Sequence, residues 1–504
     1  MSTRFKLSAL AGITSIAALQ VALVAPAAAQ TSDITAIQQQ IQALQKQNEA
    51  LQKQIQDLQA QVNNAQASAD SLQKTGGPVN KEHPGYWQLP GTQTWMTVAG
   101  HVKLDAIYDF KQSVGPQDDF GAIPMNGAPG TDRKGTWANS NAKQSYIYFE
   151  THTNTPYGDL MSHISGDFYL SAQGNPNISN SYAFRLRNAY GALGEWTFGQ
   201  DWTTFQDTAA GPNSLDFNGP AGQVFIRQPQ VRWTHSIKGT PDTVMVSLEN
   251  NTGDYFSPAG LYNGNQWNVD QDGQLGDPAG CTLGRVSPCQ NGPSQLAGSV
   301  PDIVGRWQRD SDFGHLSFMG VAREINVDTG TIGVPPDQVV KTHKWGFGLG
   351  MNAVLNMNQL SQSLGADQMF FSLNGGPGIG RYLQDLLFNG AILNDNTHQL
   401  DIVTSLGTFV GYEHFFASDE WESNLIYGYE HSSLKDVDQL IANGDQLTKQ
   451  SQSVHVNLIW HPVPSTSFGV EYSWGERKVE GFIPDGQQDH GTMSRLQFSG
   501  IYNF

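Results

Sequence analysis

The sequence predicts an all-β transmembrane barrel of about 16 antiparallel strands, preceded by an N-terminal α-helical coiled coil. From Trp95 to the C-terminus, segments of roughly ten residues alternate apolar with polar side chains, as strands do when one face meets lipid. The connections between these segments alternate between long and short. After the first thirty residues, no apolar run reaches the ~20 residues that a membrane helix needs. Because lipid satisfies no backbone hydrogen bonds, a membrane protein without spanning helices requires a closed barrel.

Residues 1–29 have the composition of a secretory signal peptide. Arg4 and Lys6 form a basic start, Leu7 to Val24 is mostly apolar, and Ala27-Ala28-Ala29 offers a cleavage site of small residues. The cleavage site favours a removed leader over the alternative, an N-terminal membrane anchor. The sequence therefore predicts export.

Residues 30–67 carry a heptad repeat that predicts a coiled coil. A stripe restricted to positions a and d favours self-association over packing on a sheet. Ile at a, Leu at d and a single Asn at a favour two strands, although we expect the following domain to set the stoichiometry. Residues 68–94 are rich in Gly and Pro and are expected to form a linker. The a positions hold Ile34, Ile41, Asn48, Ile55 and Val62, and the d positions hold Ile37, Leu44, Leu51, Leu58 and Ala65.

Residues 95–504 are expected to form the barrel. The last segment is the clearest, because its apolar side chains share one face and the chain ends on Phe504. Such an ending is typical of outer-membrane barrels and rare in soluble β-sandwiches. The predicted strands begin near Trp95, Lys143, Gly158, Phe184, Glu195, Phe225, Thr243, Asp302, Gly314, His343, Asp367, Thr397, Glu420, Gln452, Thr466 and Gly491.

The predicted connections differ in length by parity. Odd connections are long and even ones short, apart from the even connection 356–366. Short periplasmic turns and long outer loops produce this pattern in bacterial barrels. Aromatic residues in the strand segments are candidates for girdles at the two membrane interfaces. They are Trp95, Tyr146, Tyr148, Tyr169, Trp196, Trp345, Tyr427, Tyr429, Trp460 and Tyr472.

Two of the long connections have further features. Residues 206–224 hold Leu215, Asp216 and Phe217 between two Gly-Pro pairs, which predicts a compact constriction loop inside the barrel. An ordinary surface loop is the alternative. Residues 377–396 carry apolar side chains at helical spacing between Tyr382 and Phe388, which predicts a short amphipathic helix.

The alternation also assigns charged side chains to the lumen, since a charge on the lipid face costs about 2–4 kcal/mol at mid-bilayer. These charges either hydrate the wall and pair with one another, or create a field that attracts anions. Arg227 has the parity of the lipid face, so a bulge near Pro229 or a position at the rim is needed to return it to the channel. The predicted pore-lining residues are Lys103, Asp105, Asp109, Arg185, Arg187, Arg232, Arg306, Arg323, Glu471 and Arg495.

Composition excludes several function classes. The formal net charge of −18 disfavours nucleic acid as a partner. The sequence has no nucleophile elbow and no zincin motif, and its 13 His lack metal-ligand spacing, so we expect neither an enzyme nor a cofactor or metal. Cys281 and Cys289 lie in a Gly/Pro-rich stretch and are expected to form a disulfide after export, with two free thiols as the alternative.

The central motifs resemble the DcaP-like family of outer-membrane porins. They are FRLRNAYG at 184–191, GQDWTTF at 199–205, Leu215-Asp216-Phe217 and FIRQPQVR at 225–232, in that order. KLDAIYD at 103–109 and the SRLQF ending at 494–498 agree with them, whereas His101, Asn188 and the long loop with both cysteines depart from the pattern.

The resemblance implies a homotrimer of barrels in the Gram-negative outer membrane, with the coiled coil in the periplasm. It implies uptake of small anions, dicarboxylates among them, through a constriction lined by Arg185, Arg187, Arg227 and Arg232. It favours a trimer over the dimer that the heptads alone suggest.

Two other functions fit the sequence. A phosphate-selective porin is the nearest, but it should line its constriction with lysines, and Lys103 is the clearest inward lysine here. A structural envelope barrel with a closed lumen is the other. Under either function the barrel would contact outer-membrane lipid and lipopolysaccharide, and the coiled coil could contact peptidoglycan.

Overall fold

The structure is a computed structural model of the 504-residue chain. It describes residues 85–128, 137–170, 180, 182–251, 254–256, 300–328, 339–386, 389–394, 396–416 and 420–504, and four helical residues at 42, 45, 52 and 53. The chain divides into two units, Met1–Val79 and Asn80–Phe504. The predicted signal peptide, the rest of the coiled coil, most of the linker and the cysteine pair lie outside the described residues.

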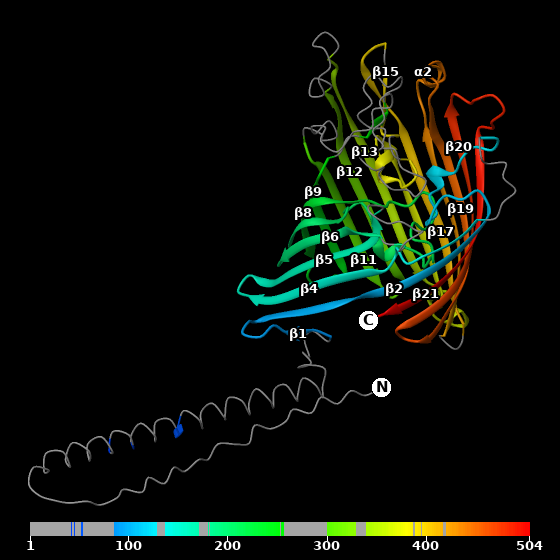
Figure 1. Ribbon diagram of the computed structural model, residues 1–504. Coiled ribbons are helices and arrows are strands. Elements are labelled where there is room, and N and C mark those ends of the chain that lie inside the picture. The colour runs from blue at the N-terminus through cyan, green and yellow to red at the C-terminus, as the bar shows by residue number, and fades with distance from the viewer. Residues whose placement is uncertain are drawn as a thin grey trace, which may run out of the picture. The chain divides into compact units, whose positions relative to one another are not determined.

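The second unit is a closed antiparallel β-barrel, as predicted (Figure 1). The sheet closes because β21 pairs with one edge of β2, with Val102 opposite Tyr502, and β4 pairs with the other edge. The sixteen strands of the barrel are β2 (Thr94–Lys111), β4 (Tyr146–Thr155), β5 (Gly158–Leu170), β6 (Ala183–Leu193), β7 (Trp196–Trp202), β8 (Arg227–Ser236), β9 (Asp242–Glu249), β11 (Asp302–Ser311), β12 (Gly314–Asp328), β13 (Lys341–Asn356), β14 (Gln368–Pro377), β17 (Thr404–Phe415), β18 (Trp421–Ser433), β19 (Gln446–Val463), β20 (Thr466–Gly481) and β21 (His490–Asn503).

Short elements accompany the barrel and correct some expectations. β1 (Trp87–Gln88) lies in the predicted linker, and with β3 (Trp137–Asn141) it extends the sheet beside β2. β10 (Tyr255–Phe256), β15 (Ala391–Asn394) and β16 (Gln399–Ile402) form a separate three-stranded sheet. The strand expected from Thr397 therefore begins at Thr404, and the residues before it pair elsewhere.

The helix predicted within 377–396 is wrong. The described residues there form a 3-10 turn, η9 (Gly380–Tyr382), followed by β15. Of the apolar side chains that suggested a helix, Tyr382, Leu383 and Leu386 are described, and all three are buried. The described helix of the barrel unit is α2 (Val437–Asn443), in a connection for which no helix was predicted. Within the described part of the chain, no helix is long and apolar enough to cross a membrane.

The connections at the two ends of the barrel differ in length, as the predicted alternation of long and short connections requires. Turns such as 156–157, 194–195 and 312–313 join consecutive strands at one end, which in bacterial barrels is the periplasmic end. The longer even connection after β13 contains two 3-10 turns, η7 (Met357–Gln359) and η8 (Gln362–Leu364).

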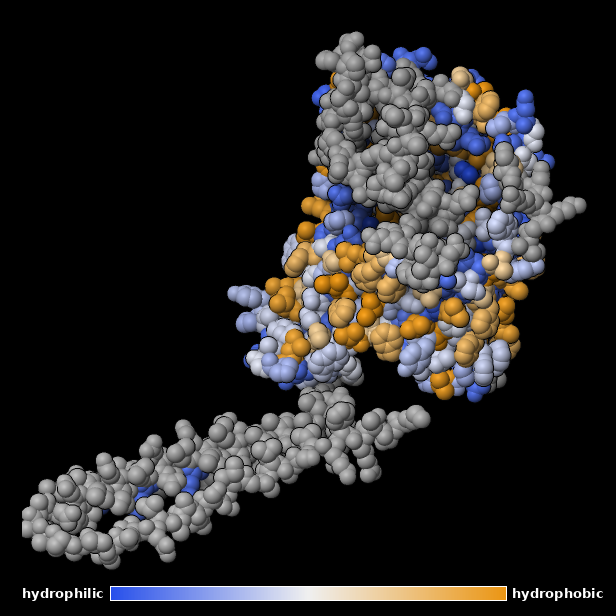
Figure 2. Space-filling view, in the orientation of Figure 1, coloured by the Kyte–Doolittle hydropathy of each residue, from blue (hydrophilic) through white to orange (hydrophobic). Residues whose placement is uncertain are grey.

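The outer wall carries an apolar band, much of which is visible on the face shown in Figure 2. Val102, Leu104 and Phe498 are about half exposed, whereas Lys103 and Gln497 beside them are buried toward the lumen. Trp196 and Tyr472 face outward, as expected of a girdle.

Three tyrosines from the predicted girdle face inward instead. Tyr169 is only 1% exposed and lies under Arg185. Tyr146 lies under Arg187, and Tyr148 stacks on His163. Aromatic content alone therefore did not distinguish a girdle residue from a lumen residue.

We expect a charge in the apolar band to destabilise the barrel. Val470 faces outward between Leu458 and Phe498, so Val470→Arg should lower the free energy of unfolding by about 2–4 kcal/mol. Thr466→Arg, at the turn end of the same strand, should cost at most about 1 kcal/mol. Urea titration of the folded fraction in lipid vesicles measures both costs. Equal costs would contradict the expectation that Val470 lies deeper in the apolar band than Thr466.

Candidate functional site

The connection between β7 and β8 runs along the inner wall of the barrel. Near its start, Arg306 Nη1 donates a hydrogen bond of 2.6 Å to the Gln206 carbonyl oxygen. Asp207 then accepts hydrogen bonds from the side chains of His315 and Ser317 on β12. Further along, Asn457 Nδ2 of β19 donates to the Asn213 carbonyl oxygen at 2.7 Å. The loop therefore contacts walls on both sides of the lumen.

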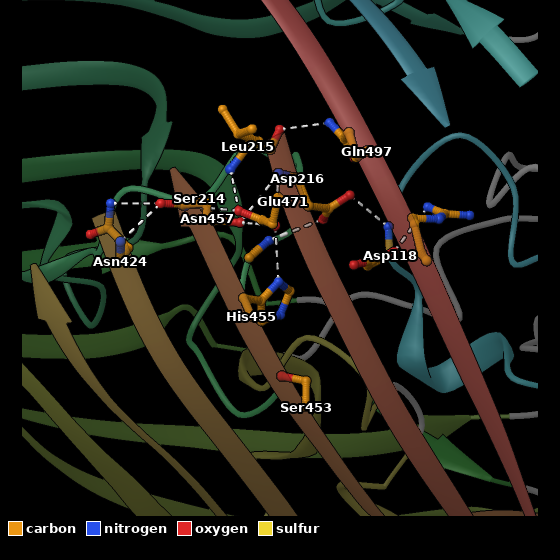
Figure 3. Close-up of polar contacts among 12 residues, drawn as sticks. Asp118, Ser214, Leu215, Asp216, Asn424, Ser453, His455, Asn457, Glu471 and Gln497 are labelled. Carbon is orange, nitrogen blue, oxygen red and sulfur yellow. Dashed lines mark hydrogen bonds and ion pairs between the residues drawn. The ribbon is translucent and has the colours of Figure 1, made fainter. Parts of the chain in front are cut away.

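The loop is fixed most firmly at Leu215 (Figure 3). Glu471 on β20 accepts hydrogen bonds from Leu215 N at 2.7 Å and from Ser214 Oγ at 2.9 Å. The Leu215 carbonyl oxygen accepts from Lys103 Nζ at 2.5 Å and from Gln497 Nε2 at 3.0 Å. Both backbone groups of Leu215 thus have partners on the barrel wall, and Leu215 itself is buried.

A second inward segment, from the connection after β2, joins this loop. Asp118 N donates to Asp216 Oδ1 at 2.8 Å, and Asn218 Nδ2 donates to the Asp118 carbonyl oxygen at 2.8 Å. Arg495 Nη1 forms an ion pair of 2.9 Å with Asp118 and a shorter one, through Nε, with Asp109.

A third inward segment comes from the connection after β14. Gly121 N donates to Asp385 Oδ1 at 3.1 Å, which links the second and third segments. Leu383 forms a β-bridge with Val224, which links the third segment to the loop between β7 and β8. Tyr382, fully buried, donates to Asp302 at 2.7 Å.

These three segments divide the predicted pore-lining residues into two groups. Six of them are at most 3% exposed, because the inward segments cover them. Strand alternation gives the face of a side chain correctly, but it does not show what packs on that face. The prediction that these six line the open pore is therefore wrong, and they serve as anchors or as parts of sealed ion pairs. They are Lys103, Asp105, Asp109, Arg323, Glu471 and Arg495.

The other group stays partly exposed and gathers on β6 and β8. Arg185 binds Asp167 through two hydrogen bonds of 2.9 and 2.8 Å, and Arg187 Nε lies 3.7 Å from the same carboxylate. Arg232 forms an ion pair of 3.0 Å with Asp201. We call Arg185, Arg187, Arg227 and Arg232 the arginine cluster. Arg306 of β11 lies farther along the wall, at the start of the loop.

Arg227 reaches the lumen without a bulge. The pairing of β7 with β8 runs in continuous register from Trp196 opposite Trp233 to Trp202 opposite Arg227, so the bulge considered near Pro229 is wrong. Arg227 is the first residue of β8, and its guanidinium carbon lies 3.4 Å from the centre of the Trp202 ring. Trp202 lines a cavity inside the barrel, which places this strand end in the lumen.

Aromatic rings hold the guanidinium groups of the cluster. Phe217, at the tip of the loop, lies 5.4 Å from Arg185 and 5.1 Å from Arg187, measured from ring centre to guanidinium carbon. Phe225 contacts both Phe217 and Trp202, which joins these rings into one row. Stacking on a ring face leaves the N–H edges of a guanidinium available.

Some of these N–H groups have no partner. Among the described residues, Nε of Arg187, Arg227 and Arg232 and Nη2 of Arg227 are buried without a hydrogen bond. A buried donor without an acceptor is costly, so an acceptor from outside the chain would be bound favourably. The geometry can therefore bind a carboxylate or a similar anion.

Sequence reasoning missed Asp167, Asp201, Tyr169, Trp202 and Phe225 as members of this site. Asp167 and Tyr169 share the inward parity of β5, which was a usable signal. Trp202 is the last residue of β7 and Phe225 precedes β8, and parity gives no assignment at such positions. The described part of the chain contains no cluster of metal ligands.

Glycines on the wall allow the loop backbone to approach. A Cβ on Gly428 of β18 would lie 2.3 Å from the Ala221 carbonyl oxygen, and one on Gly407 of β17 would lie 2.4 Å from that of Gly222. No side chain fits at either position while the loop stays in place.

The chain is similar to one protein family and to the structure of an outer-membrane channel. The DcaP outer membrane protein family matches residues 20–257. The outer membrane channel DcaP of Acinetobacter baumannii has a similar structure, with 18% identity and a TM-score of 0.61 over 83% of this chain and 99% of that one. OmpT of Vibrio cholerae and an anion-selective porin from Comamonas acidovorans each give 10% identity and a TM-score of 0.45, over 82% of this chain and 99% and 100% of theirs. None of the curated proteins matches. The family resemblance drawn from the motifs is confirmed.

We expect Gly428→Ala to lower the single-channel conductance. The added methyl group must push Ala221 away from the wall and toward the lumen, because the nearest atoms are backbone. Gly500→Ala is the control, since its Cβ would meet only the Phe468 ring, at 3.4 Å. Planar-bilayer recordings compare the two variants with the wild type. Unchanged conductance in Gly428→Ala would contradict the tight seat of the loop.

We also expect the contact between the second inward segment and the loop to weaken as the pH rises toward about 7. Burial and the adjacent carboxylate of Asp216 raise the pKa of Asp118 to about 7, although Arg495 opposes this. A raised pKa means that the folded contact retains a proton that an open, solvated Asp118 would lose near its usual value. Stability from this contact is therefore present on the acid side and is lost as the pH rises through about 7.

Conductance measured between about pH 4 and pH 8 tests this dependence. It should rise with pH in the wild type, as ionised Asp118 and Asp216 repel each other, and should stay flat in Asp118→Asn. Asp485→Asn, an exposed position in another connection, is the matched control and should keep the wild-type dependence. If Asp118→Asn keeps the wild-type pH dependence of conductance, a titratable group other than Asp118 causes that dependence.

Proposed function

Since the chain matches the DcaP outer membrane protein family over residues 20–257 and folds as a porin barrel, we propose that it is a porin for small hydrophilic solutes that prefers anions such as dicarboxylates. Family and fold indicate a channel of the Gram-negative outer membrane. The anion preference rests on the arginine cluster.

One observation carries the preference. Four arginines share one wall with two aspartates, and Arg227 has no acidic partner among the described residues. The cluster therefore keeps a net positive charge beside the path that the inward segments leave. Unpaired guanidinium edges suit a carboxylate, which can accept two parallel hydrogen bonds.

The alternatives fit less well. A phosphate-selective porin would use inward lysines, but Lys103 is 3% exposed and is bound to Leu215 and Asp105. A structural barrel with a closed lumen is favoured by how much of the interior the three segments fill. The arginine cluster argues against a closed barrel, because its unpaired N–H groups would destabilise a barrel that binds and conducts no anion.

We further propose the assembly that the sequence suggests. The heptad repeat at 30–67 would join three chains in the periplasm and could contact peptidoglycan. The barrels would form a homotrimer surrounded by lipid and lipopolysaccharide. Removal of residues 1–29 and a disulfide between Cys281 and Cys289 complete this proposal. The family match begins at residue 20 and so includes the heptad segment.

The triple variant Arg185→Gln, Arg187→Gln and Arg232→Gln tests the anion preference. The wild type under a KCl gradient should give a reversal potential that favours chloride, and the variant should shift it toward potassium, because three positive charges leave the lumen. Arg309→Gln is the control, since Arg309 is half exposed at the turn end of β11 and bound to Asp242.

Each outcome is decisive. A wild type that favours potassium, or a triple variant with unchanged selectivity, would reject the arginine mechanism while keeping a porin. A wild type with no conductance would favour the structural barrel.

A further inference from the structure

A cavity of about 270 Å³ lies inside the barrel beside the arginine cluster. Trp202 and Phe409 provide aromatic walls, and the start of the loop between β7 and β8 provides Gln206, Asp207 and Thr208. The inner faces of β13 and β14 complete it with Asn352, Ser372 and Asn374. None of these residues was assigned to the site by the sequence.

The cavity is rich in hydrogen-bond acceptors that lack donors. Among the described residues, the side-chain carbonyl oxygens of Gln206, Asn352 and Asn374 are buried without a hydrogen bond. Asn352 and Asn374 are at most 5% exposed, so bulk water does not reach them freely. Three such oxygens on residues that line one cavity favour a guest that donates several hydrogen bonds.

The surrounding charges restrict the kind of donor. Asp207 would attract an ammonium group, but its oxygens already accept from His315, Ser317 and the Ala209 backbone N–H. Arg306 binds the Gln206 backbone at the edge of the cavity, and Arg227 stacks on Trp202. Two nearby cations make an ammonium guest unfavourable, whereas neutral hydroxyl groups meet no such repulsion.

Trp202 connects the cavity to the anion site. Its ring lines the cavity and also supports the guanidinium group of Arg227, whose Nε and Nη2 have no partner among the described residues. A solute whose carboxylate binds Arg227 would therefore extend past the ring edge into the cavity. An aromatic wall also suits the C–H face of a carbon chain or sugar ring.

We propose that this cavity binds the hydroxyl groups of polyhydroxylated carboxylates, so that the porin retains sugar acids more strongly than simple carboxylates. The inference rests on the proposed anion preference and adds a second determinant to it. Asn352, Asn374 and Gln206 determine the specificity, and the arginine cluster supplies the affinity for the charged group.

Current interruptions in planar bilayers test the proposal with two solutes of six carbons, gluconate and hexanoate. Gluconate has hydroxyl groups and hexanoate has none. In the wild type, the dissociation constant of gluconate should be at least ~10-fold lower than that of hexanoate, because each hydrogen bond is worth about 1 kcal/mol and tenfold is about 1.4 kcal/mol.

The double variant Asn352→Leu with Asn374→Leu should raise the dissociation constant of gluconate about 10-fold. It should leave the dissociation constant of hexanoate within about twofold of the wild-type value. Gln206→Met, in the loop and of similar shape, should act in the same direction without altering a barrel strand. Asn154→Leu, at the exposed turn end of β4, is the matched control and should change neither constant.

The outcomes separate this inference from the function on which it rests. A chloride-selective wild type that binds gluconate no more tightly than hexanoate would overturn the cavity proposal and keep the anion porin. A potassium-selective wild type would overturn the anion preference itself. Equal losses for both solutes in the Asn double variant would assign the asparagines to the shape of the channel and reject the specificity role.

Discussion

The interior of this barrel depends on one buried carboxylate, Glu471. It accepts hydrogen bonds from the Leu215 N–H, the Ser214 hydroxyl, Asn457 and His455, so its charge is satisfied although it is 2% exposed. A buried charge that loses its partners costs several kcal/mol, which strongly favours the loop in its inward position over a loop in solvent. From this point the loop positions Asp216 against the second inward segment and Phe217 against two arginines. An anchor on β20 thereby determines the geometry of the arginine cluster on β6 and β8.

The charges inside the barrel fall into two populations with different electrostatic effects. Lys103 with Asp105, Arg495 with Asp109 and Asp118, and Arg323 with Asp254 and Asp302 are buried pairs or triads. Opposite charges held within a few ångströms weaken each other's field in the channel, although each triad has one more carboxylate than arginine. Their contribution is to hold the inward segments in place. The arginine cluster has more arginines than carboxylates, so it contributes most of the electrostatic field along its wall.

Much of this fold could be predicted from the sequence, since a period-two pattern and the parity of the connections determine strand number, face and closure. Val102, Leu104 and Phe498 face out and Lys103 and Gln497 face in as the alternation requires. Whether an inward side chain is exposed to the lumen or buried depends on the segments that cover it. The sequence pattern does not show this, because those contacts join residues far apart in the sequence, such as Leu215 and Glu471. The alternation also fails to assign a face to residues at strand ends, such as Trp202 and Arg227. The cavity residues Asn352 and Asn374 gave no sequence signal, because polar inward residues are ordinary in any porin wall.

The use of arginine in the cluster follows from its neighbours. A guanidinium group can stack on Trp202, Phe217 or Tyr146 and still present N–H groups at its edge, whereas an ammonium group on a flexible chain would have no fixed orientation there. Because the rings fix the planes of the guanidinium groups, the N–H donors are already oriented, and binding of the proposed anion would cost less entropy. The aromatic ring at the loop tip thus makes the inward fold of the loop a condition for the orientation of the arginines. Under the proposed anion preference, constriction and selectivity both depend on the contact between Phe217 and the arginines. A barrel that kept its arginines but released the loop would then lose both.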